Sequence, residues 1–452
     1  MVWIRGFSPK SKEKSGKLIS MKYSIAKGVF DILPEDPTKD GAFRASHLWH
    51  YLEETIRKLA RDYGFSEIRT PVFERTELFI RGVGESSDIV TKEMYTFEDK
   101  AGRQMTLRPE GTAAVMRAVV EKRLDQLGKK QKLFYIGPMF RYERPQAGRY
   151  RQHHQFGVEA IGDPTPEQDV EVIDMLVELY RRLGITQLTV MLNSVGDAAT
   201  RKQYRDALRE FLKPKLDQLS EESQVRFEKN ILRILDSKSA TDQNALEGAP
   251  LIHDYLSEEA RDHFKRVQTL LKSLDIPFTL EPKLVRGLDY YNQTVFEVTS
   301  ESLGAQNAIG AGGRYDGLMS LLGGPDLPSV GFAVGLERIL HTMLSQKAPL
   351  PEKPHPLLFV IPLGDKAQKA AFELVHQLRH KSIPTEIDFN LKKVGKALEA
   401  AVSMGATYAL VLGEDELSSK QITLKELAKR EETSLPLGEL ENFLLGKQSQ
   451  GD

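Results

Sequence analysis

Cysteine is absent from the 452 residues, which excludes disulfide bonds, thiolate metal ligands and a cysteine nucleophile. An excess of charge is also absent, because 63 Lys and Arg residues balance 64 Asp and Glu residues and leave a formal net charge of −1. A near-neutral chain is not a polybasic binder, so any polyanion must be met by local basic patches. No apolar run approaches the roughly 18 residues that span a bilayer, so no membrane partner is expected.

Several well-known catalytic motifs are missing as well. The chain has no HExxH, no G-x-S-x-G and no kinase signature. The Gly-rich stretch "AIGAGGRYDGL", residues 308–318, matches neither the dinucleotide fingerprint nor the Gly-Lys-Ser/Thr of a P-loop. His153 and His154 are neighbours, so on a strand they face opposite ways and do not predict a metal site.

The length and the local composition predict several domains. Residues 1–21 are basic and lack the apolar core of a secretory signal, so we expect a disordered tail. Residues 22–345 mix helix and strand patterns, and the charged, nearly Gly-free residues 197–272 within them predict a helical insertion. Four prolines in "APLPEKPHP" predict a stiff linker at 346–356. Residues 357–447 then predict a small α/β domain with a mostly parallel sheet.

Hydrophobic periodicity predicts the individual elements. An amphipathic helix is expected at 41–64, with Gly64 as its left-handed cap. A further helix is expected at 167–183. Strands are predicted at "SEIRTPVF", "GRQMTL", "KLFYIGPMFRYE", "YRQHHQFGVEAIG", "LTVMLNS", "YNQTVFEVTS" and "AIGAGG". Beyond the linker, strands at "LLFVIPL", "PTEID" and "TYALVLG" alternate with helices at 366–380 and 394–404, and "KREETSLPLGELENF" has no clear assignment.

The stretch "FRYERPQAGRYRQHHQFGVEA", residues 140–160, holds Arg141, Arg144, Arg149 and Arg151 within a dozen positions. Two strands joined by the loop "RPQAGR" make a platform on which arginine forks can bind phosphate oxygens in pairs. The alternative is a solvated, charged hairpin.

Three further stretches carry polar side chains in apolar surroundings. Glu110 in "TLRPEGT" either stabilises a helix start or pairs with a substrate ammonium group. Arg286 in "LVRGLDYYNQTVFE" precedes two tyrosines that point to opposite faces if the segment is extended. The alternative there is a strand with a snorkelling arginine and one core tyrosine. Arg338 lies near a helix start in the Gly-rich "GFAVGLERI".

In this order, these stretches resemble the histidyl-tRNA synthetases, which are class II aminoacyl-tRNA synthetases. The resemblance runs from "KGVFDILPED" at residue 27 to about residue 425. It places motif 1 in 41–64 with "IRTPVFE", motif 2 in "FRYERPQAGRYRQHHQFGVE" and motif 3 in "GFAVGLERI". The histidine-specific signatures match "LVRGLDYYNQTVFE" and "AIGAGGRYDGL". The resemblance implies an antiparallel sheet flanked by helices, an anticodon-binding domain at the C-terminus, a cytoplasmic homodimer and motif 1 at the dimer interface.

The reaction implied is the activation of histidine by ATP and transfer of the histidyl group to histidine tRNA. By resemblance, Arg141 grips the α-phosphate of ATP, and Arg338 reaches the γ-phosphate and flanks the adenine. Arg286 neutralises the substrate carboxylate and the α-phosphate, at the place where other class II enzymes hold a metal ion. Magnesium is still expected on the ATP phosphates, although no protein ligand for it is predicted.

The resemblance also implies a histidine pocket. Glu110, Thr112 and Gln155, with Gly111 beside them, are expected to bind the α-amino group. Glu159 and Tyr291 are expected to reach the imidazole nitrogens, with Tyr290 nearby. A pocket that bonds both nitrogens rejects apolar isosteres without an editing domain, so the helical insertion is expected to contact tRNA.

Arg144, Gln146 and Arg151 are expected at the tRNA acceptor end. One position departs from the family, which usually has Phe stacked on adenine where this chain has His153. A neutral imidazole can stack, but it is smaller and can titrate, so the sequence predicts weaker ATP binding at acidic pH than in a variant with Phe at this position.

Two non-enzymatic alternatives share this resemblance: the synthetase-like regulatory subunit of histidine biosynthesis, and a tRNA-sensing module. The regulatory subunit lacks the anticodon domain, the catalytic arginines and the amino-group carboxylate. This chain keeps Glu110, Arg141, Arg286 and Arg338, which favours the enzyme over both alternatives.

Overall fold

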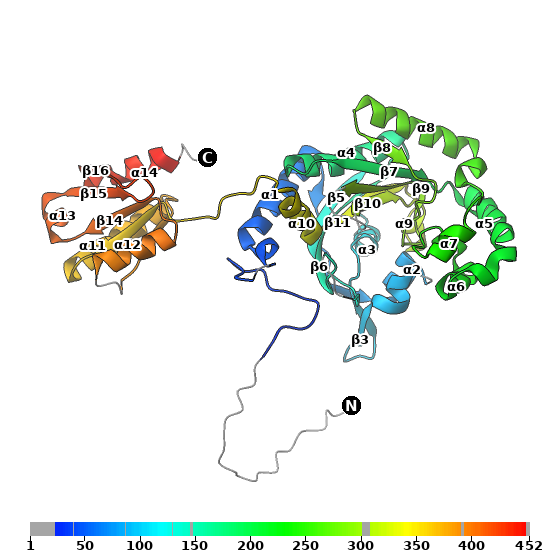
Figure 1. Cartoon of the computed structure of the whole chain (residues 1–452), viewed down its shortest axis with the longest axis horizontal. Coiled ribbons are helices and arrows are strands. Elements are labelled where there is room, and N and C mark those ends of the chain that lie inside the picture. Colours follow the sequence, from blue (N-terminus) through cyan, green and yellow to red (C-terminus); the bar gives the residue numbers. More distant parts are fainter. Residues whose placement is uncertain are drawn as a thin grey trace, which may run out of the picture. The chain divides into compact units, whose positions relative to one another are not determined.

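The computed structural model describes residues 23–38, 40–85, 87–128, 130–144, 148–300, 308–389 and 393–448. The chain divides after Leu350 into two compact units (Figure 1). The first unit ends with helix α10, and the described residues between Gln346 and Leu358 form neither helix nor strand. Each unit has a hydrophobic core of its own.

The first unit is built on a large sheet. Within the described residues, eight strands follow the order β1-β5-β6-β11-β10-β9-β7-β8. All neighbours from β5 to β7 in this order are antiparallel, whereas the edge pairs β1–β5 and β7–β8 are parallel. The expected antiparallel sheet is therefore confirmed in its central part. The strands are β1 (Ser66–Glu67), β5 (Gln131–Phe140), β6 (Gln152–Ile161), β7 (Leu188–Ser194), β8 (Phe278–Leu280), β9 (Asn292–Ser300), β10 (Ala308–Arg314) and β11 (Ser329–Gly335).

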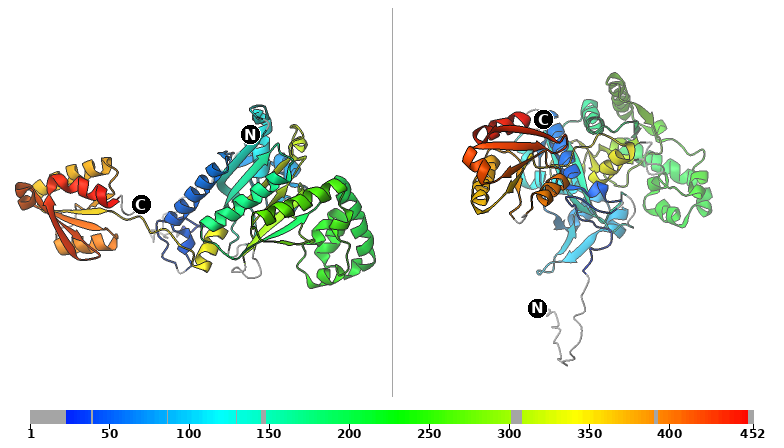
Figure 2. Two further views of the ribbon diagram at one scale, coloured as in Figure 1. Left: turned by 90° about the horizontal axis from the view of Figure 1, so that it is seen from above. Right: turned by 60° about the vertical axis from the view of Figure 1, so that its left-hand side comes forward.

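One face of this sheet packs against the helices α1 (Ser46–Asp62), α4 (Pro166–Arg182) and α10 (Leu336–Gln346) (Figures 1 and 2). The period of two along β6 explains how the strand serves both faces. Phe156, Val158 and Ala160 join the core under these helices. The residues between them face the other side. The predicted Gly64 cap follows α1 with φ +74°.

The other face of the sheet carries the smaller elements. A three-stranded sheet of order β2-β4-β3 lies there together with three helices. The prediction of one strand in "SEIRTPVF" was wrong, because the segment divides between β1 of the large sheet and β2 of the small one. Pro71, which predicted an edge or a strand end, lies at this division and has no N–H to donate to a ladder. The elements are β2 (Phe73–Arg75), α2 (Thr76–Val83), β3 (Tyr95–Glu98), β4 (Gln104–Leu107), α3 (Thr112–Lys122) and α9 (Leu318–Leu321).

All the regular elements that the structure describes within the predicted helical insertion are helices. Tyr204, Leu208 and Leu212 recur every four residues on α5 and pack against Phe227 and Ile231 in a separate core. The last helix, α8, packs against α4 and leads into the edge strand β8. The elements of the insertion are α5 (Ala198–Leu212), η4 (Lys213–Gln218), α6 (Glu221–Lys229), η5 (Ile231–Ile234), α7 (Ala240–Ala245), η6 (Ile252–Tyr255) and α8 (Glu258–Ser273).

The second unit has a five-stranded sheet of order β13-β12-β14-β15-β16 across its described residues. The first three strands are parallel, as their alternation with helices predicted. The chain then adds an antiparallel hairpin, β15–β16, and a helix, which the sequence left unassigned. The elements are β12 (Leu358–Pro362), α11 (Asp365–His380), β13 (Thr385–Ile387), α12 (Val394–Ser403), β14 (Tyr408–Leu412), α13 (Glu414–Ser419), β15 (Gln421–Glu426), β16 (Glu431–Pro436) and α14 (Leu440–Gln448).

Candidate active site

A cavity of about 550 Å³ lies over the large sheet, and six arginines line it. Three of them are the arginines that the sequence selected, and they come from distant segments. Arg141 follows the end of β5, Arg286 lies in the segment between β8 and β9, and Arg338 lies in the first turn of α10. His153 and Gln155 of β6 line the same cavity. We call it the three-arginine cavity.

The sheet register gives this cavity a flat floor. Tyr135 on β5 pairs with Gly157 on β6, which pairs with Ala333 on β11. Ala333 in turn pairs with Ala311 on β10, and Ala311 pairs with Glu297 on β9. The three central positions of this row carry at most a methyl group. The Tyr135 ring covers Gly157, since a Cβ there would lie 2.3 Å from the tyrosine hydroxyl, so a flat ligand can approach the strands closely over Ala333 and Ala311.

Main-chain and carboxylate partners orient the three arginines. Arg141 donates from Nε to the carbonyl of Pro109 at 2.8 Å, and Arg338 donates from Nη1 to the carbonyl of Ala308 at 2.7 Å. Arg286 donates from Nη1 to Glu297, while its buried Nε has no hydrogen-bond partner among the described residues. Each guanidinium is thus fixed at one edge and presents further N–H groups to the cavity.

The two adjacent histidines face opposite sides of β6, as predicted. His153 lines the three-arginine cavity. The His154 ring packs against Trp49, with ring centroids 4.9 Å apart, and its Nδ1 lies 3.0 Å from Glu337. Burial, aided by the nearby positive charge of Arg141, lowers the pKa of His153 to about 3. The expected titration of His153 at mildly acidic pH was therefore wrong, because the imidazole stays neutral far below pH 5.5.

Beside the three-arginine cavity lies a buried polar cluster, which we define as Glu110, Thr112, Tyr135, Glu159, Tyr290, Tyr291 and Tyr315. Glu110 is 4% exposed and Glu159 is 1% exposed. Burial is the main cause of the raised pKa of Glu159, and the negative charge of Glu110 adds to it, so the two carboxyls interact. The cluster adjoins the cavity at Arg141, whose positive charge partly offsets the rise in the pKa of Glu110 that burial causes.

Glu110 stabilises the start of helix α3, which is one of the two roles that the sequence left open. Its Oε2 accepts a hydrogen bond from the Thr112 amide at 2.7 Å, and its Oε1 accepts one from the Ala113 amide at 2.9 Å. These are orphan donors at the start of α3. Burial raises the pKa of Glu110, and the two amide hydrogen bonds oppose this. The carboxylate caps the helix and keeps its remaining lone pairs for a donor.

Tyr315 and Thr112 both act on Glu159, and both oppose the rise in its pKa that burial causes. Tyr315 donates its hydroxyl hydrogen to Oε2 of Glu159, whereas Oε1 is buried without a hydrogen-bond partner among the described residues. The buried Oε1 of Gln155, four residues earlier, also lacks a partner there. Burial raises the pKa of Glu159 to about 8. Unpaired buried acceptors are costly, so these two point to a ligand that donates N–H groups.

The two neighbouring tyrosines do not point to opposite faces. Their ring centroids are 4.7 Å apart, and both rings lie within 6.1 Å of the Tyr315 ring. The prediction assumed an extended segment, but β9 begins only at Asn292, and the preceding residues form bends and turns. A glycine makes room for the rings, because a Cβ at Gly313 would lie 3.0 Å from Cδ1 of Tyr291.

The residues expected at the tRNA acceptor end are only partly described. Arg144 is exposed, beyond the end of β5. Arg151 stacks its guanidinium over the Tyr142 ring at 4.1 Å and donates to the carbonyl of Glu143 at 3.3 Å. Gln146 lies outside the described residues.

Sequence reasoning missed some members of the site. Tyr135, Glu297 and Tyr315 were not selected, although Glu297 and Tyr315 stand inside the quoted signatures. In the second signature, Arg314 is 1% exposed and binds Asp169 of α4 at 2.5 Å, so it is structural. Asp169 also pairs with His263 of α8 at 2.7 Å.

Comparison with solved structures places this fold among the class II aminoacyl-tRNA synthetases. Apo histidyl-tRNA synthetase of S. aureus superposes with a TM-score of 0.79 at 36% identity, over 94% of this chain and 100% of that chain. A protein titled ATP phosphoribosyltransferase regulatory subunit/histidyl-tRNA synthetase, from Bacillus halodurans C, shares the fold alone, with a TM-score of 0.62 at 21% identity over 88% of this chain and 99% of that chain.

Sequence comparison narrows the class to a family. The family described as Histidyl-tRNA synthetase matches residues 38–339, and the one described as Anticodon binding domain matches residues 358–447. Histidine--tRNA ligase of Protochlamydia amoebophila is 57% identical over 420 residues, which cover 93% of this chain and 99% of the relative. The chain therefore belongs to the histidyl-tRNA synthetase family. None of its described helices is long and apolar enough to cross a membrane.

Proposed function

We propose that the chain is a histidine–tRNA ligase that activates histidine with ATP and charges histidine tRNA. In the first step, a histidine carboxylate oxygen attacks the α-phosphorus, and pyrophosphate leaves. In the second, a ribose hydroxyl of the tRNA end attacks the activated carbonyl, and AMP leaves. The observation that carries the proposal is the convergence of Arg141, Arg286 and Arg338 on one cavity beside two buried, interacting carboxyls.

The three-arginine cavity supplies positions for ATP. The flat floor suits the nucleotide, with His153 stacked on adenine as a neutral ring. Arg141 holds the α-phosphate, and Arg338 holds the γ-phosphate. Arg286 bridges the histidine carboxylate and the α-phosphate, and Glu297 keeps its guanidinium in place. Such preorganised cations stabilise the charge that develops in the displacement.

The buried polar cluster supplies the histidine pocket. Glu110, Thr112 and Gln155 bind the α-amino group, and Gly111 beside them leaves room for the Tyr135 ring, whose Cζ a Cβ there would meet at 2.2 Å. Glu159 and Tyr291 bind the two imidazole nitrogens, with Tyr290 completing the wall. The unpaired Oε1 atoms of Gln155 and Glu159 fit the N–H donors of histidine. An apolar isostere would leave these acceptors buried and unpaired, which costs about 1–3 kcal/mol for each group.

Magnesium is proposed on the ATP phosphates. Among the described residues, no cluster of three or more His, Asp or Glu side chains is placed to hold a metal ion. Mg²⁺ commonly keeps several waters and uses one or two carboxylates plus substrate phosphates. Glu143 fits this role, because it lines the cavity and its Oε2 has an ion pair with Arg149 at 3.5 Å but no hydrogen-bond partner among the described residues. When bound, the ion would neutralise phosphate charge.

Arg144, Gln146 and Arg151 are proposed contacts of the tRNA acceptor end, and the second unit is proposed to bind the anticodon. We further propose a homodimer with motif 1 at its interface and a cytoplasmic location, as the family resemblance implies. Analytical ultracentrifugation of the purified chain tests the dimer: a single monomeric species at micromolar concentration contradicts it.

Histidine-dependent ATP–pyrophosphate exchange tests the main proposal, followed by charging of histidine tRNA. Exchange with histidine, and none with other amino acids, is the expected result. The regulatory-subunit and tRNA-sensing alternatives predict no exchange. The 57% identity to a histidine--tRNA ligase over nearly the whole chain favours the enzyme over the regulatory alternative.

A further inference from the structure

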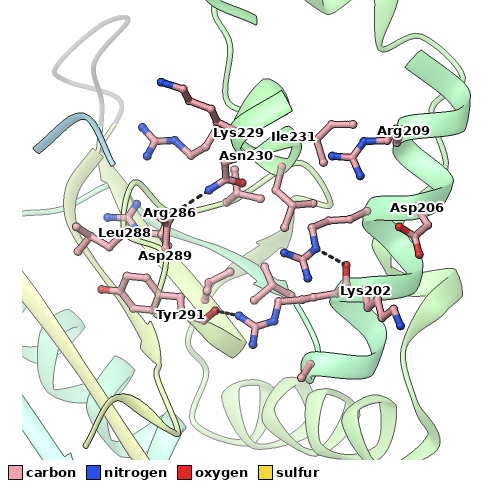
Figure 3. A pocket seen from close by; sticks show the side chains of 18 residues that line it. Lys202, Asp206, Arg209, Lys229, Asn230, Ile231, Arg286, Leu288, Asp289 and Tyr291 are labelled. Atoms are coloured by element: carbon pink, nitrogen blue, oxygen red, sulfur yellow. Dashed lines mark hydrogen bonds between the residues drawn. The ribbon is translucent and has the colours of Figure 1, made fainter. Parts of the chain in front are cut away.

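A second cavity, of about 540 Å³, lies between the helical insertion and the segment that carries Arg286 (Figure 3). Its walls come from α5, from residues 229–233 and from residues 285–291. Seven Lys or Arg side chains line it, against two Asp side chains. We call it the insertion cavity. This excess of positive charge is local, since the whole chain carries a formal net charge of −1.

The positive charge is organised as a stripe along one helix. Arg201, Arg205 and Arg209 recur every four residues on α5, so they lie on one side of it. Like charges at this spacing repel one another and destabilise a helix. In Figure 3, Arg209 extends from α5 toward the segment of Asn230 and Ile231.

Main-chain carbonyls, and not carboxylates, hold these arginines. Arg201 donates to the Tyr291 carbonyl at 2.8 Å, Arg205 to the Arg201 carbonyl at 3.2 Å and Arg209 to the Phe227 carbonyl at 3.4 Å. Among the described residues, none of the three comes within 4.0 Å of a carboxylate oxygen, and the same holds for Lys202 and Lys229. Their positive charges are therefore not neutralised by ion pairs within this part of the chain.

The nearby carboxylates are engaged elsewhere or face away. Asp289 accepts a hydrogen bond from Asn230 at 2.8 Å. Asp88 pairs with Arg233 at 2.9 Å, and Glu297 pairs with Arg286. Asp206, the other lining carboxylate, stays close to α5 in Figure 3. The field inside the insertion cavity is therefore positive and favours an anion.

We propose that the insertion cavity binds a phosphate group, separately from the three-arginine cavity. Guanidinium forks bind two phosphate oxygens at once, and lysines at the rim add point charges. The phosphate has two chemical sources: a free anion such as pyrophosphate, or a phosphodiester of an RNA backbone. This site is defined by the geometry of described residues alone, so it does not depend on the proposed reaction.

The insertion cavity adjoins the three-arginine cavity. Arg201 donates to the carbonyl of Tyr291 at 2.8 Å, and Arg233 donates to the carbonyl of Gly287 at 3.0 Å. These two bonds bracket the segment that follows Arg286, and Arg286 itself lines both cavities.

The test uses the full chain, with its three-arginine cavity filled by a non-hydrolysable ATP analogue and histidinol. Inorganic pyrophosphate is then titrated by calorimetry into the parent protein, R205Q/R209Q and the control K265Q/K272Q. The control removes the same charge from exposed positions of α8. We expect one further site in the parent and the control, weakened at least tenfold in R205Q/R209Q and partly restored in R205K/R209K.

A second arm distinguishes the RNA source. The dependence of tRNA affinity on salt is measured for the same proteins, because each lost phosphate contact makes the slope of log K against log salt less negative by about 0.9. A slope that is less negative by about 1–2 in R205Q/R209Q, and unchanged in the control, supports the proposal with RNA as source. A pyrophosphate site that R205Q/R209Q retains, or no pyrophosphate site together with equal salt slopes, overturns it. Failure of histidine-dependent exchange would count against the proposed function. The comparison of R205Q/R209Q with K265Q/K272Q would still decide the present proposal, because none of these four residues lines the three-arginine cavity.

Discussion

The hydroxyl of Tyr315 is hydrogen-bonded to Oε2 of Glu159, inside a cluster where that carboxyl is 1% exposed. A tyrosine thus occupies one edge of the carboxyl, and the other edge is left for a ligand. Burial raises the pKa of Glu159 to about 8, so in the empty pocket Oε1 carries a proton at neutral pH, and a ligand N–H that binds there must displace that proton.

The empty protein should therefore lose stability as the pH rises. In the unfolded chain, Glu159 ionises near the ordinary glutamate pKa of 4.5, whereas in the folded chain it ionises at about 8. Since the folded pKa is raised, the stabilising contribution is complete below about pH 4.5 and is lost as the pH rises to about 8, at about 1.4 kcal/mol per pKa unit. Melting curves at pH 5, 6.5 and 8 measure it. E159Q should flatten the difference between pH 5 and 8, and an unchanged slope in E159Q contradicts the assignment.

ATP affinity should be insensitive to the ionisation of residue 153. With its pKa near 3, His153 remains neutral from pH 5.5 to 8, and H153F removes no titrating group in that range. The ratio of ATP KM values between H153F and the parent should therefore stay constant across this range, measured by pyrophosphate exchange. A ratio that changes tenfold between pH 5.5 and 8 would show that the imidazole does become charged.

Removal of the Arg286 charge should slow activation far more than it weakens histidine binding. R286Q should lower the exchange kcat by about 10²–10³, as loss of one preorganised donor to a developing oxyanion does. E297Q keeps the arginine but loses its charged partner, so its loss should be smaller and in the same direction. R69Q, at an exposed arginine, is the control. Equal kcat values for R286Q and R69Q would remove Arg286 from the mechanism.

Addition of a single methyl group at Gly331 should damage the histidine pocket. A Cβ there would lie 2.2 Å from the Val158 carbonyl, 2.5 Å from Oε2 of Glu159 and 2.7 Å from the Tyr315 hydroxyl. Overpacking of this kind costs about 1–3 kcal/mol, so the histidine KM of G331A should rise about 5- to 150-fold. On the same strand, a Cβ at Gly335 meets nothing closer than 3.9 Å, so G335A should keep the parent histidine KM. Equal effects of the two variants would refute a specific role for Gly331.

The sequence predicted the framework of the fold well, because periodicity is a direct result of burial. Leu48, Leu52 and Ile56 of α1 are buried at the spacing that predicted the helix. The wrong or missing strand predictions lie where one continuous pattern divides between two sheets, or where a strand has too little buried surface to show a pattern. "SEIRTPVF" divides between two sheets at Pro71, and strand β16 of the C-terminal hairpin is largely exposed, so it has little hydrophobic patterning.

The site was predictable as a set of residues but not as a geometry. Motif order selected Arg141, Arg286 and Arg338, and the structure brings them to one cavity. Their orienting partners were not predictable, because Glu297 becomes the neighbour of Arg286 only through the turn that precedes β9. The neutrality of His153 also depends on burial, which a local pattern does not show.

The links of Asp169 to Arg314 and His263 have a consequence for attempts to build a minimal synthetase. Excision of residues 197–272 would delete the imidazole that faces Asp169 and most of the helix packed over it. A shortened enzyme should therefore retain α8, or replace Asp169 and Arg314 together with apolar residues of similar volume. A deletion within the insertion should therefore end before Glu258, so that α8 is kept.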